Sequence, residues 1–465
     1  MKDIQTTIDA EKITISEALV SKYSKAGPRY TSYPTAPNWD DTFGPDDFVR
    51  QIEKGNEKKT PLSLYFHIPF CEERCTFCAC NVVATKRHEV SEPYLEALIH
   101  EIKTVAQKTD GSREVSQLHW GGGTPTYLNP KQIEKLYNII LQNFVFEKDA
   151  EISVEIDPRI TTEEQLKVLR QLGFNRVSLG VQDFEPEVQK LAGRIQPEKQ
   201  TRHAVEVCRE LKFKSINMDL IYGLPKQTLQ TFQSTIQKVL VLDPDRIALF
   251  NFAYVPWMHA HQRKIFDQDL ATPIQKLKMF CEAVQSFQNN GYEFIGLDHF
   301  AKKNDELSVA KLHCTMYRNF QGYTTKSFCD MIGMGVTSIS HLSGAFAQNA
   351  KKLKDYENLA LSQGLATQRG MFLNADDLKR EWVIRELMCH QCVDKKAFEK
   401  TFDIPFDVYF KKELEKLPPL EKDQLICLNS EKIRVTPLGR IFLRNIAMLF
   451  DAYLQPQQKQ FSKTL

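Results

Sequence analysis

Residues 62–80 read LSLYFHIPFCEERCTFCAC, a short apolar run followed directly by four closely spaced cysteines. The run predicts a buried β-strand because it is short, rich in aromatic side chains and closed by Pro69. Five similar runs follow it, at residues 115–120, 151–156, 176–181, 216–223 and 246–252. Helical patterns separate the runs, so the sequence predicts repeated βα units.

Six consecutive βα units predict an α/β fold with a mostly parallel sheet and right-handed crossovers. The pattern does not distinguish an open doubly wound sheet from a complete or partial barrel. In either architecture we expect the ligand site at the carboxyl ends of the strands. One intervening helix has well-marked ends, because Thr162 and Gln165 have capping-box spacing and Gly173 follows the last turn.

Beyond about residue 370, helical patterns at 375–390, 406–416 and 437–453 flank two short strand-like runs, QLICL and KIRVT. They predict a separate, small and mainly helical domain. A winged helix is one interpretation, but a packing or substrate-covering role is favoured because no basic face stands out.

The composition limits the partners of the chain. Its 61 basic and 59 acidic residues leave a formal charge of +2, which gives no electrostatic case for binding nucleic acid or an anionic membrane. No apolar stretch has the character of a signal peptide or a membrane span, so we expect a cytoplasmic protein that is not inserted in a membrane. The 11 cysteines are then best interpreted as reduced thiols and ligands.

The cysteine spacing favours an iron–sulfur cluster. Cys71, Cys75 and Cys78 form a C-x3-C-x2-C group without a distant partner motif, which indicates three ligands and one iron left open for an exchangeable ligand. Zinc is the main alternative, but zinc sites usually have four ligands built from C-x2-C pairs. Cys80 lies two residues beyond the third cysteine and is not assigned to iron.

Several further strand ends carry residues suited to a binding site. Residues 120–125 read WGGGTP, a glycine run whose backbone allows a close approach to a ligand. Glu155 ends the third run, Gln182 follows the fourth, Asp219 lies in the fifth and Ala253 follows the sixth. Polar residues at these positions are expected to point into a shared mouth, although each one alone is as often structural.

The cysteine spacing, with Phe77 before the third cysteine, resembles the radical S-adenosylmethionine superfamily. Nearly the whole chain is similar to one of its families, the oxygen-independent coproporphyrinogen III oxidases (coproporphyrinogen dehydrogenases). The motifs that carry this resemblance are GPRYTSYPTA (27–36), SLYFHIPFC (63–71), QLHWGGGTPTYL (117–128), EISVEIDPR (151–159), GVQDF (180–184), DLIYGLPKQT (219–228), DHFA (298–301), RNFQGYTT (318–325) and GMGVTSIS (333–340).

The resemblance implies an incomplete (β/α)6 TIM-like barrel with a C-terminal, mainly helical, winged-helix-like domain. The implied segments are an N-terminal extension covering the active site (1–56), the catalytic barrel with its extension (57–365) and the C-terminal domain (366–465). It also implies one [4Fe–4S] cluster on Cys71, Cys75 and Cys78 and two bound S-adenosylmethionine molecules. The first would contact Tyr65, Gly122, Glu155 and Ile339; the second would contact Phe77, Gly123, Thr124, Gln182, Arg194, Asp219 and Ala253.

The implied reaction removes a hydrogen atom from a propionate β-carbon of coproporphyrinogen III, then carbon dioxide and one electron, on two propionates, giving protoporphyrinogen IX in haem biosynthesis. No catalytic residue beyond the cofactors is implied, the electron donor would be a flavodoxin or ferredoxin, and a monomer is expected. Arg29 and Arg318 are candidates for binding substrate carboxylates because guanidinium forks suit them.

Two departures from the family pattern are Ala79, where glycine is usual, and Tyr317, where histidine is common. They leave open a haem-handling paralogue that has lost the decarboxylase activity. A third alternative is a zinc-stabilised interaction protein.

Overall fold

The computed structural model describes residues 3–454 and 461–464, and it contains two compact units. Unit 1 comprises Met1–Asn38, Leu220–Ser327 and Asn374–Leu465; unit 2 comprises Trp39–Asp219 and Phe328–Leu373. The predicted division at residues 1–56, 57–365 and 366–465 follows the sequence and not these spatial units, and it stays a prediction.

Unit 2 is built on a sheet whose central strands are parallel. The order of its strands is β8 (Arg176–Gln182), β7 (Phe146–Ile156), β6 (Val115–Gly122), β3 (Leu62–Ile68), β15 (Asp330–Met334), β16 (Ile339–Leu342), β17 (Ala345–Asn349) and β18 (Thr367–Phe372). The last three pair in antiparallel fashion. The chain leaves unit 2 within β9 (Ser215–Tyr222), which follows β8 in the sheet.

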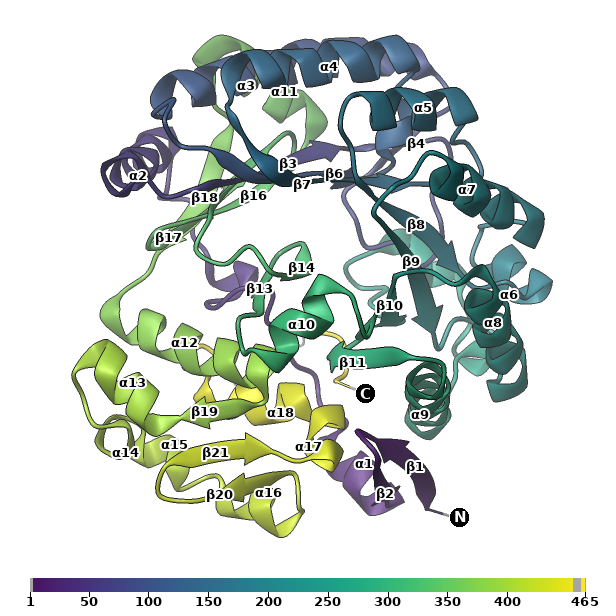
Figure 1. The fold of residues 1–465 in the computed structure, drawn as a ribbon, viewed down its shortest axis with the longest axis vertical. Coiled ribbons are helices and arrows are strands. Elements are labelled where there is room, and N and C mark those ends of the chain that lie inside the picture. The colour runs from purple at the N-terminus through teal and green to yellow at the C-terminus, as the bar shows by residue number, and fades with distance from the viewer. Residues whose placement is uncertain (1–2, 455–460, 465) are drawn as a thin grey trace. The chain divides into compact units, whose positions relative to one another are not determined.

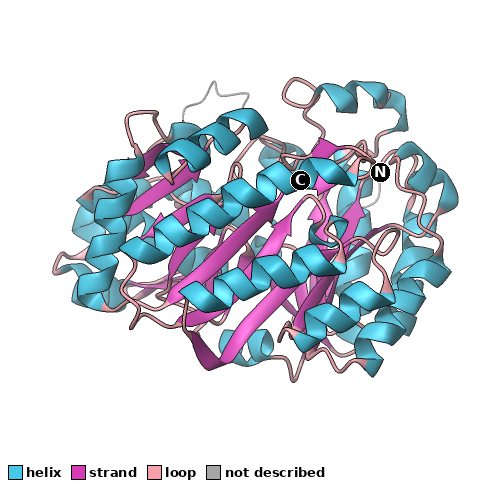
Figure 2. Ribbon diagram, turned by 90° about the horizontal axis from the view of Figure 1, so that it is seen from above, coloured by secondary structure: helices cyan, strands magenta, loops and turns pink. Residues whose placement is uncertain are grey.

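Helices cover one face of this sheet, as Figures 1 and 2 show. The helices of unit 2 are α2 (Pro45–Lys58), α3 (Ser91–Lys108), α4 (Pro130–Asn143), α5 (Glu163–Gln171), α6 (Pro186–Leu191), α7 (Glu198–Glu210) and α11 (Leu353–Gln363). Phe66 of β3 and Trp120 of β6 are register partners, and the Trp120 ring contacts Tyr137 of α4. Because side chains alternate along a strand, Tyr65 and its partner His119 lie on the opposite face, away from these helices.

Unit 1 contains an antiparallel set of three strands: β10 (Arg246–Asn251), β12 (His299–Lys302) and β11 (Tyr292–Gly296). Two hairpins, β1 (Ile4–Ile8) with β2 (Glu11–Ile15) and β13 (Tyr317–Asn319) with β14 (Gly322–Thr324), also belong to it. Its longer helices are α8 (Leu229–Leu242), α9 (Pro273–Asn289) and α12 (Ala375–His390). Shorter helices are α1 (Glu17–Tyr23), α10 (Glu306–Leu312), α13 (Lys395–Phe402), α14 (Phe406–Tyr409), α15 (Lys411–Leu414), α16 (Pro418–Lys422), α17 (Pro437–Ile441) and α18 (Leu443–Ala447). A small sheet of β19 (Cys392–Asp394), β21 (Lys432–Val435) and β20 (Ile426–Leu428) lies among the C-terminal helices.

All six predicted strands are confirmed, as β3, β6, β7, β8, β9 and β10. The α/β class, the mainly helical C-terminal part and the capping box of Thr162 and Gln165 on α5 are also confirmed. The helical patterns at 406–416 and 437–453 are also confirmed, although each range contains short helices and not one continuous helix. The helices are interrupted at Phe410 and Phe442, whose ψ angles are 25° and 20° and whose rings are completely buried.

The closure of the six units into a barrel stays a prediction. No helix in the described ranges combines the length and the apolar character that a membrane-spanning segment requires.

Candidate functional site

The cysteine loop starts at the end of β3 and is tied back to it by short backbone pairing. β4 (Phe70–Cys71) pairs in parallel with β5 (Val83–Ala84), so the chain returns to the strand end after the last cysteine. In the middle of the loop, the Thr76 N–H donates to the carbonyl of Ala192 at 2.9 Å and its hydroxyl donates to that of Leu191 at 2.9 Å. The end of α6 therefore fixes the loop between its cysteines, beside Phe77.

The four thiols of the loop differ in exposure. Cys75 is buried, Cys71 and Cys78 are half-buried, and Cys80 is exposed. Burial raises the pKa of Cys71 to about 11, although the Thr124 hydroxyl, 3.4 Å from its sulfur, favours the thiolate. Cys80 is thus the most exposed of the four thiols, and it forms a side-chain hydrogen bond with Cys78.

Two guanidinium groups face the sulfur of Cys75. Nη2 of Arg159 lies 4.0 Å and Nη1 of Arg194 lies 3.8 Å from Sγ. Both arginines also pair with the carboxylate of Asp157, at 2.7 and 3.0 Å, which orients them. Both guanidinium groups therefore lie beside a predicted iron ligand.

The glycine run at the end of β6 packs against Phe70 on one side and Glu155 on the other, and it leaves no room for side chains. A Cβ at Gly123 would lie 2.7 Å from the carbonyl oxygen of Phe70, and one at Gly121 would lie 2.9 Å from the carboxylate of Glu155. Gly122 has a φ of +117°, and its N–H donates to Oε2 of Glu155 at 3.1 Å. This packing brings the cysteine loop and Glu155 together, and the close approach of the glycine run to a ligand stays a prediction.

Glu155 belongs to a polar cluster on the face of the sheet away from the helices. Oε1 of Glu155 lies 3.2 Å from Nε2 of His119, whose ring stacks on Tyr65 at 5.9 Å. The Tyr65 hydroxyl in turn lies 3.0 Å from Nδ1 of His67. Burial alone would raise the pKa of Glu155, but hydrogen bonds from His119 and Gly122 hold it below its usual range.

Sequence reasoning missed His67 and His119. A signal was present, because Tyr65 and His67 are two residues apart in a strand and must share a face. The register that places His119 opposite Tyr65 is a tertiary fact that no single strand reveals.

Gln182 and Arg194 lie side by side at the end of β8. A Cβ at Gly180 would lie 3.1 Å from Nε2 of Gln182 and 3.1 Å from Nη2 of Arg194. Gln182 has a φ of +69°, which is strained for a residue with a side chain. Its Oε1 is buried and has no hydrogen-bond partner among the described residues. A buried acceptor of this kind suits a ligand that donates a hydrogen bond.

Asp219 lies one strand further along, in β9. Its carboxylate accepts hydrogen bonds from Nδ2 of Asn217 at 2.8 Å and from the hydroxyl of Ser178 at 3.3 Å. Burial, and after it the charge of Glu155, raises the pKa of Asp219 to about 7. Two nearby carboxyl groups therefore have pKa values shifted in opposite directions.

The remaining predicted contacts are placed as follows. Ile339 is the first residue of β16. Its carbonyl oxygen would lie 2.4 Å from a Cβ at Gly333, and Gly333 is the register partner of Tyr65. Ala253 follows β10 in unit 1, where its carbonyl accepts from Nε2 of Gln262 at 3.1 Å. Unit 2 thus holds every residue predicted to contact the cluster or S-adenosylmethionine except Ala253, whereas Arg29 and Arg318, the candidates for binding substrate carboxylates, lie in unit 1. Ala79 has no positive φ, so its loop accommodates a side chain where the family usually has glycine.

Comparison with known proteins identifies the fold and the family. Residues 65–239 match the radical SAM superfamily, and residues 373–442 match the HemN C-terminal domain. The chain is 46% identical to the oxygen-independent coproporphyrinogen III oxidases of Synechocystis sp. and Escherichia coli, over 97% and 98% of this chain and 98% and 100% of theirs. The solved structure of coproporphyrinogen III oxidase from Escherichia coli, described as a radical SAM enzyme, has a TM-score of 0.89 at 46% identity and covers 92% of this chain and 98% of that one.

A parallel sheet with a cysteine loop at a strand end, together with the first of these matches, defines a member of the radical SAM superfamily. Within the superfamily, the chain belongs to the oxygen-independent coproporphyrinogen III oxidase family.

The residues present fit the [4Fe–4S] cluster and the S-adenosylmethionine that this superfamily implies. The loop supplies thiols that form no disulfide, and Gln182 supplies a buried acceptor without a partner among the described residues. Within the described ranges, no three His, Cys, Asp or Glu side chains converge as a site for a single metal ion requires. A cluster does not require such convergence, because its cysteines are distributed over several iron atoms.

Proposed function

We propose that this chain catalyses the oxygen-independent oxidative decarboxylation of two propionate side chains of coproporphyrinogen III to vinyl groups, giving protoporphyrinogen IX in haem biosynthesis. One observation carries the proposal: the cysteine loop after β3 lies in a chain that is 46% identical, over 97% of its length, to a relative named for this activity.

The cofactor assignment is part of the proposal. Cys71, Cys75 and Cys78 hold one [4Fe–4S] cluster, and two S-adenosylmethionine molecules bind at the strand ends. When bound, these cofactors supply a 5′-deoxyadenosyl radical that removes a hydrogen atom from a substrate propionate. The first S-adenosylmethionine contacts Tyr65, Gly122, Glu155 and Ile339, and the second contacts Phe77, Gly123, Thr124, Gln182, Arg194, Asp219 and Ala253.

The roles of individual side chains follow from their chemistry. The ionised Glu155, held by His119 and Gly122, suits the positively charged amino group of a bound S-adenosylmethionine. The unpartnered Oε1 of Gln182 accepts a hydrogen bond from a nucleoside, and so does Asp219 when it is ionised. Because the cofactors carry the hydrogen abstraction, no side chain of the protein has to act as a nucleophile or base.

Each decarboxylation balances without oxygen. The propionate loses one hydrogen atom from its β-carbon, which forms 5′-deoxyadenosine, then carbon dioxide and one electron, which a one-electron acceptor takes up, and a vinyl group remains. A flavodoxin or ferredoxin supplies the electron that starts each turnover. The protein acts as a monomer in the cytoplasm.

An anaerobic assay tests the proposal. The cluster-loaded protein with reductant, S-adenosylmethionine and coproporphyrinogen III should form protoporphyrinogen IX, methionine and 5′-deoxyadenosine, and air should abolish the activity. A preparation that cleaves S-adenosylmethionine but never decarboxylates the substrate, and binds haem tightly instead, would favour the haem-handling paralogue.

A further inference from the structure

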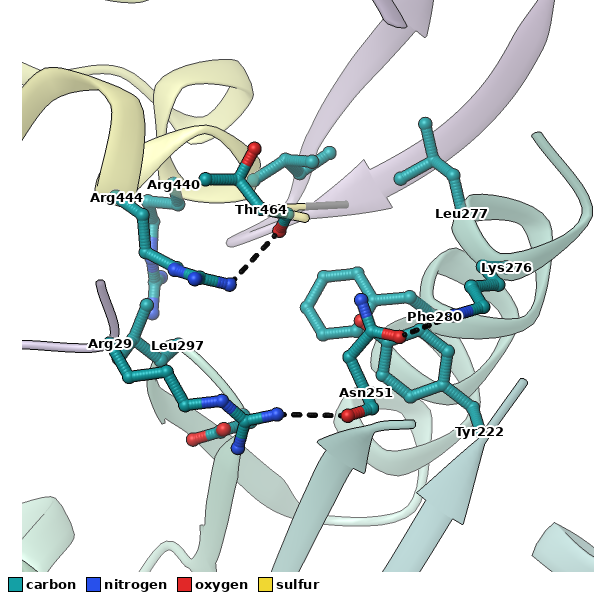
Figure 3. Close-up of a pocket in the computed structure, with 12 residues that line it drawn as sticks. Arg29, Tyr222, Asn251, Lys276, Leu277, Phe280, Leu297, Arg440, Arg444 and Thr464 are labelled. Carbon is teal, nitrogen blue, oxygen red and sulfur yellow. Dashed lines mark hydrogen bonds between the residues drawn. The ribbon is translucent and has the colours of Figure 1, made fainter. Parts of the chain in front are cut away.

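Two cavities in unit 1 share Asn251 and Lys276. The smaller, drawn in Figure 3, has a volume of about 50 Å³ and is rich in cations. Its charged lining residues are Arg29, Lys276, Arg440, Arg444 and Asp298. The larger has a volume of about 710 Å³, and Phe252, Tyr254, Trp257 and Phe461 line it. A small cationic recess therefore adjoins a spacious aromatic one.

Two of the four cations are occupied by the protein itself. Arg440 forms an ion pair with Asp9 and donates a hydrogen bond to the carbonyl of Phe294. Its guanidinium group also lies 4.1 Å from the centre of the Phe294 ring. Arg444 donates to the backbone carbonyls of Gly27 and Pro28, at 2.9 Å for the latter, and of Lys463 and Thr464. These two arginines hold the N-terminal and C-terminal segments of unit 1 and leave Arg29 and Lys276 as the cations available to a ligand.

Arg29 and Lys276 are anchored to the same residue. Figure 3 shows them reaching Asn251 from different directions: Nη2 of Arg29 donates to its backbone carbonyl at 2.8 Å, and Nζ of Lys276 donates to its Oδ1 at 3.1 Å. Lys276 also donates to the carbonyl of Phe252 at 3.1 Å. Five N–H donors on a guanidinium and three on an ammonium leave further donors on both groups.

Arg29 and Lys276 are not paired with a carboxylate among the described residues. Within the described part of the chain, Arg29 and Lys276 form no ion pair. Asp298, the one acidic side chain of the small cavity, is bound to Nδ1 of His299 at 2.7 Å, and its charge also interacts with Arg29. Burial, followed by the charges of Lys463 and Arg29, lowers the pKa of Lys276 to about 8. A bound anion would remove this repulsion.

The stem of Lys276 is fixed, so its ammonium group is positioned before a ligand arrives. A Cβ at Gly223 would lie 2.6 Å from Cε of Lys276, which shows that the stem packs directly on this glycine. The ammonium group also lies 5.9 Å from the centre of the Phe252 ring. An ordered cation loses little conformational entropy when an anion binds.

We propose that Arg29 and Lys276, bridged by Asn251, bind a propionate carboxylate of the tetrapyrrole substrate, whose apolar body occupies the adjoining aromatic cavity. This inference rests on the proposed function. The small cavity admits one carboxylate but not a ring system, whereas the large cavity offers aromatic surface and ample volume. A small free carboxylate has the same head-group chemistry but no use for that aromatic surface.

The test measures binding of coproporphyrin III, the air-stable oxidised form of the substrate, to the cluster-loaded full chain, by quenching of tryptophan fluorescence. We expect Arg29→Met and Lys276→Met each to weaken binding about tenfold or more, because each removes a charge-assisted hydrogen bond. Lys278→Met is the matched control, since Lys278 is exposed on the same helix. Lys276→Arg should restore most of the affinity. The tetramethyl ester of coproporphyrin III, which has no carboxylates, should bind equally well to Lys276→Met and to the unmodified chain.

Equal coproporphyrin III affinity in Lys276→Met, Arg29→Met and Lys278→Met would overturn the inference. So would displacement of the porphyrin by acetate at a comparable concentration, which would assign the recess to small free carboxylates. Turnover of coproporphyrinogen III, measured in parallel, separates the two hypotheses. If the unmodified chain turns over the substrate and Lys276→Met has the same KM, the proposed carboxylate pocket is refuted but the proposed function is not. If binding depends on Lys276 but no turnover occurs, the proposed function is refuted but the pocket is not.

Discussion

Nε2 of His119 lies 3.2 Å from Oε1 of Glu155, and the two side chains come from neighbouring strands of one sheet. The contact orients the carboxylate and, with the Gly122 N–H, keeps its pKa below the usual range despite burial. His119 is therefore a positioning residue for a group that we assign to the first S-adenosylmethionine.

Replacing His119 with phenylalanine should change the pH dependence of S-adenosylmethionine binding and leave the cluster in place. Without the hydrogen bond from His119, the pKa of Glu155 rises, so the carboxylate is lost at a higher pH. We expect His119→Phe to bind almost normally at pH 8 and several-fold more weakly at pH 6, relative to the unmodified chain, in equilibrium binding assays. His203→Phe, at an exposed histidine paired with Glu163, is the control. A parallel loss at both pH values would contradict the positioning role.

The exposure of Cys80 leads to a second prediction. Cys71→Ser, Cys75→Ser and Cys78→Ser should each lose most of the iron and the brown colour of an anaerobic preparation, because each removes a cluster ligand that we propose. Cys80→Ser should keep its iron, since a fourth protein ligand would occupy the iron that S-adenosylmethionine needs. Iron analysis and absorbance spectra give the answer, and equal iron loss in Cys80→Ser and Cys75→Ser would show that Cys80 is a ligand.

The raised pKa of Asp219 predicts a pH-dependent stability. Because burial raises this pKa to about 7, the folded protein binds the proton more tightly than the unfolded chain, in which the pKa is about 4. The resulting stabilisation is complete below pH ~4 and is lost as the pH rises through about 7. The asparagine of Asp219→Asn cannot ionise. The unfolding free energy of this variant should therefore increase relative to that of the unmodified chain as the pH rises from 5 to 8.

Urea unfolding of protein free of S-adenosylmethionine checks this expectation. Asp149→Asn, at an exposed position of β7, should show no such trend. A difference between Asp219→Asn and the unmodified chain that stays constant across the pH range would mean that Asp219 is not held neutral.

Much of the fold could be predicted because its signals are local. Short stretches of sequence are enough to predict the six buried runs, the capping box of α5 and the cysteine loop after β3, because apolar runs and residue spacing identify them. The antiparallel strands β16, β17 and β18 were not predicted. They gain their stability from pairing beside β15, a contact between distant segments.

The same distinction applies to the site. Glu155, Gln182 and Asp219 could be found because they stand at strand ends. The partners that determine their chemistry, among them His119 and Asn217, come from register and burial. Lys276 likewise hydrogen-bonds to Asn251 and Phe252 and not to a carboxylate, which depends on the residues that lie near it in space and not on the sequence alone.

Binding of coproporphyrin III should weaken as the pH rises through about 8, because Lys276 then loses its proton in the ligand-free protein. A bound carboxylate favours the ammonium form, so binding takes up a proton above this pH, and the affinity should fall by up to tenfold per pH unit. The charged or ionisable groups around Lys276 are Arg29, Arg440, Arg444, Lys463, Asp298 and Tyr222. In Lys276→Arg the slope should disappear, since arginine stays protonated throughout this range. Titrations from pH 7 to pH 9.5 measure the slope, and an equal slope in Lys276→Arg would assign the titration to another of these groups.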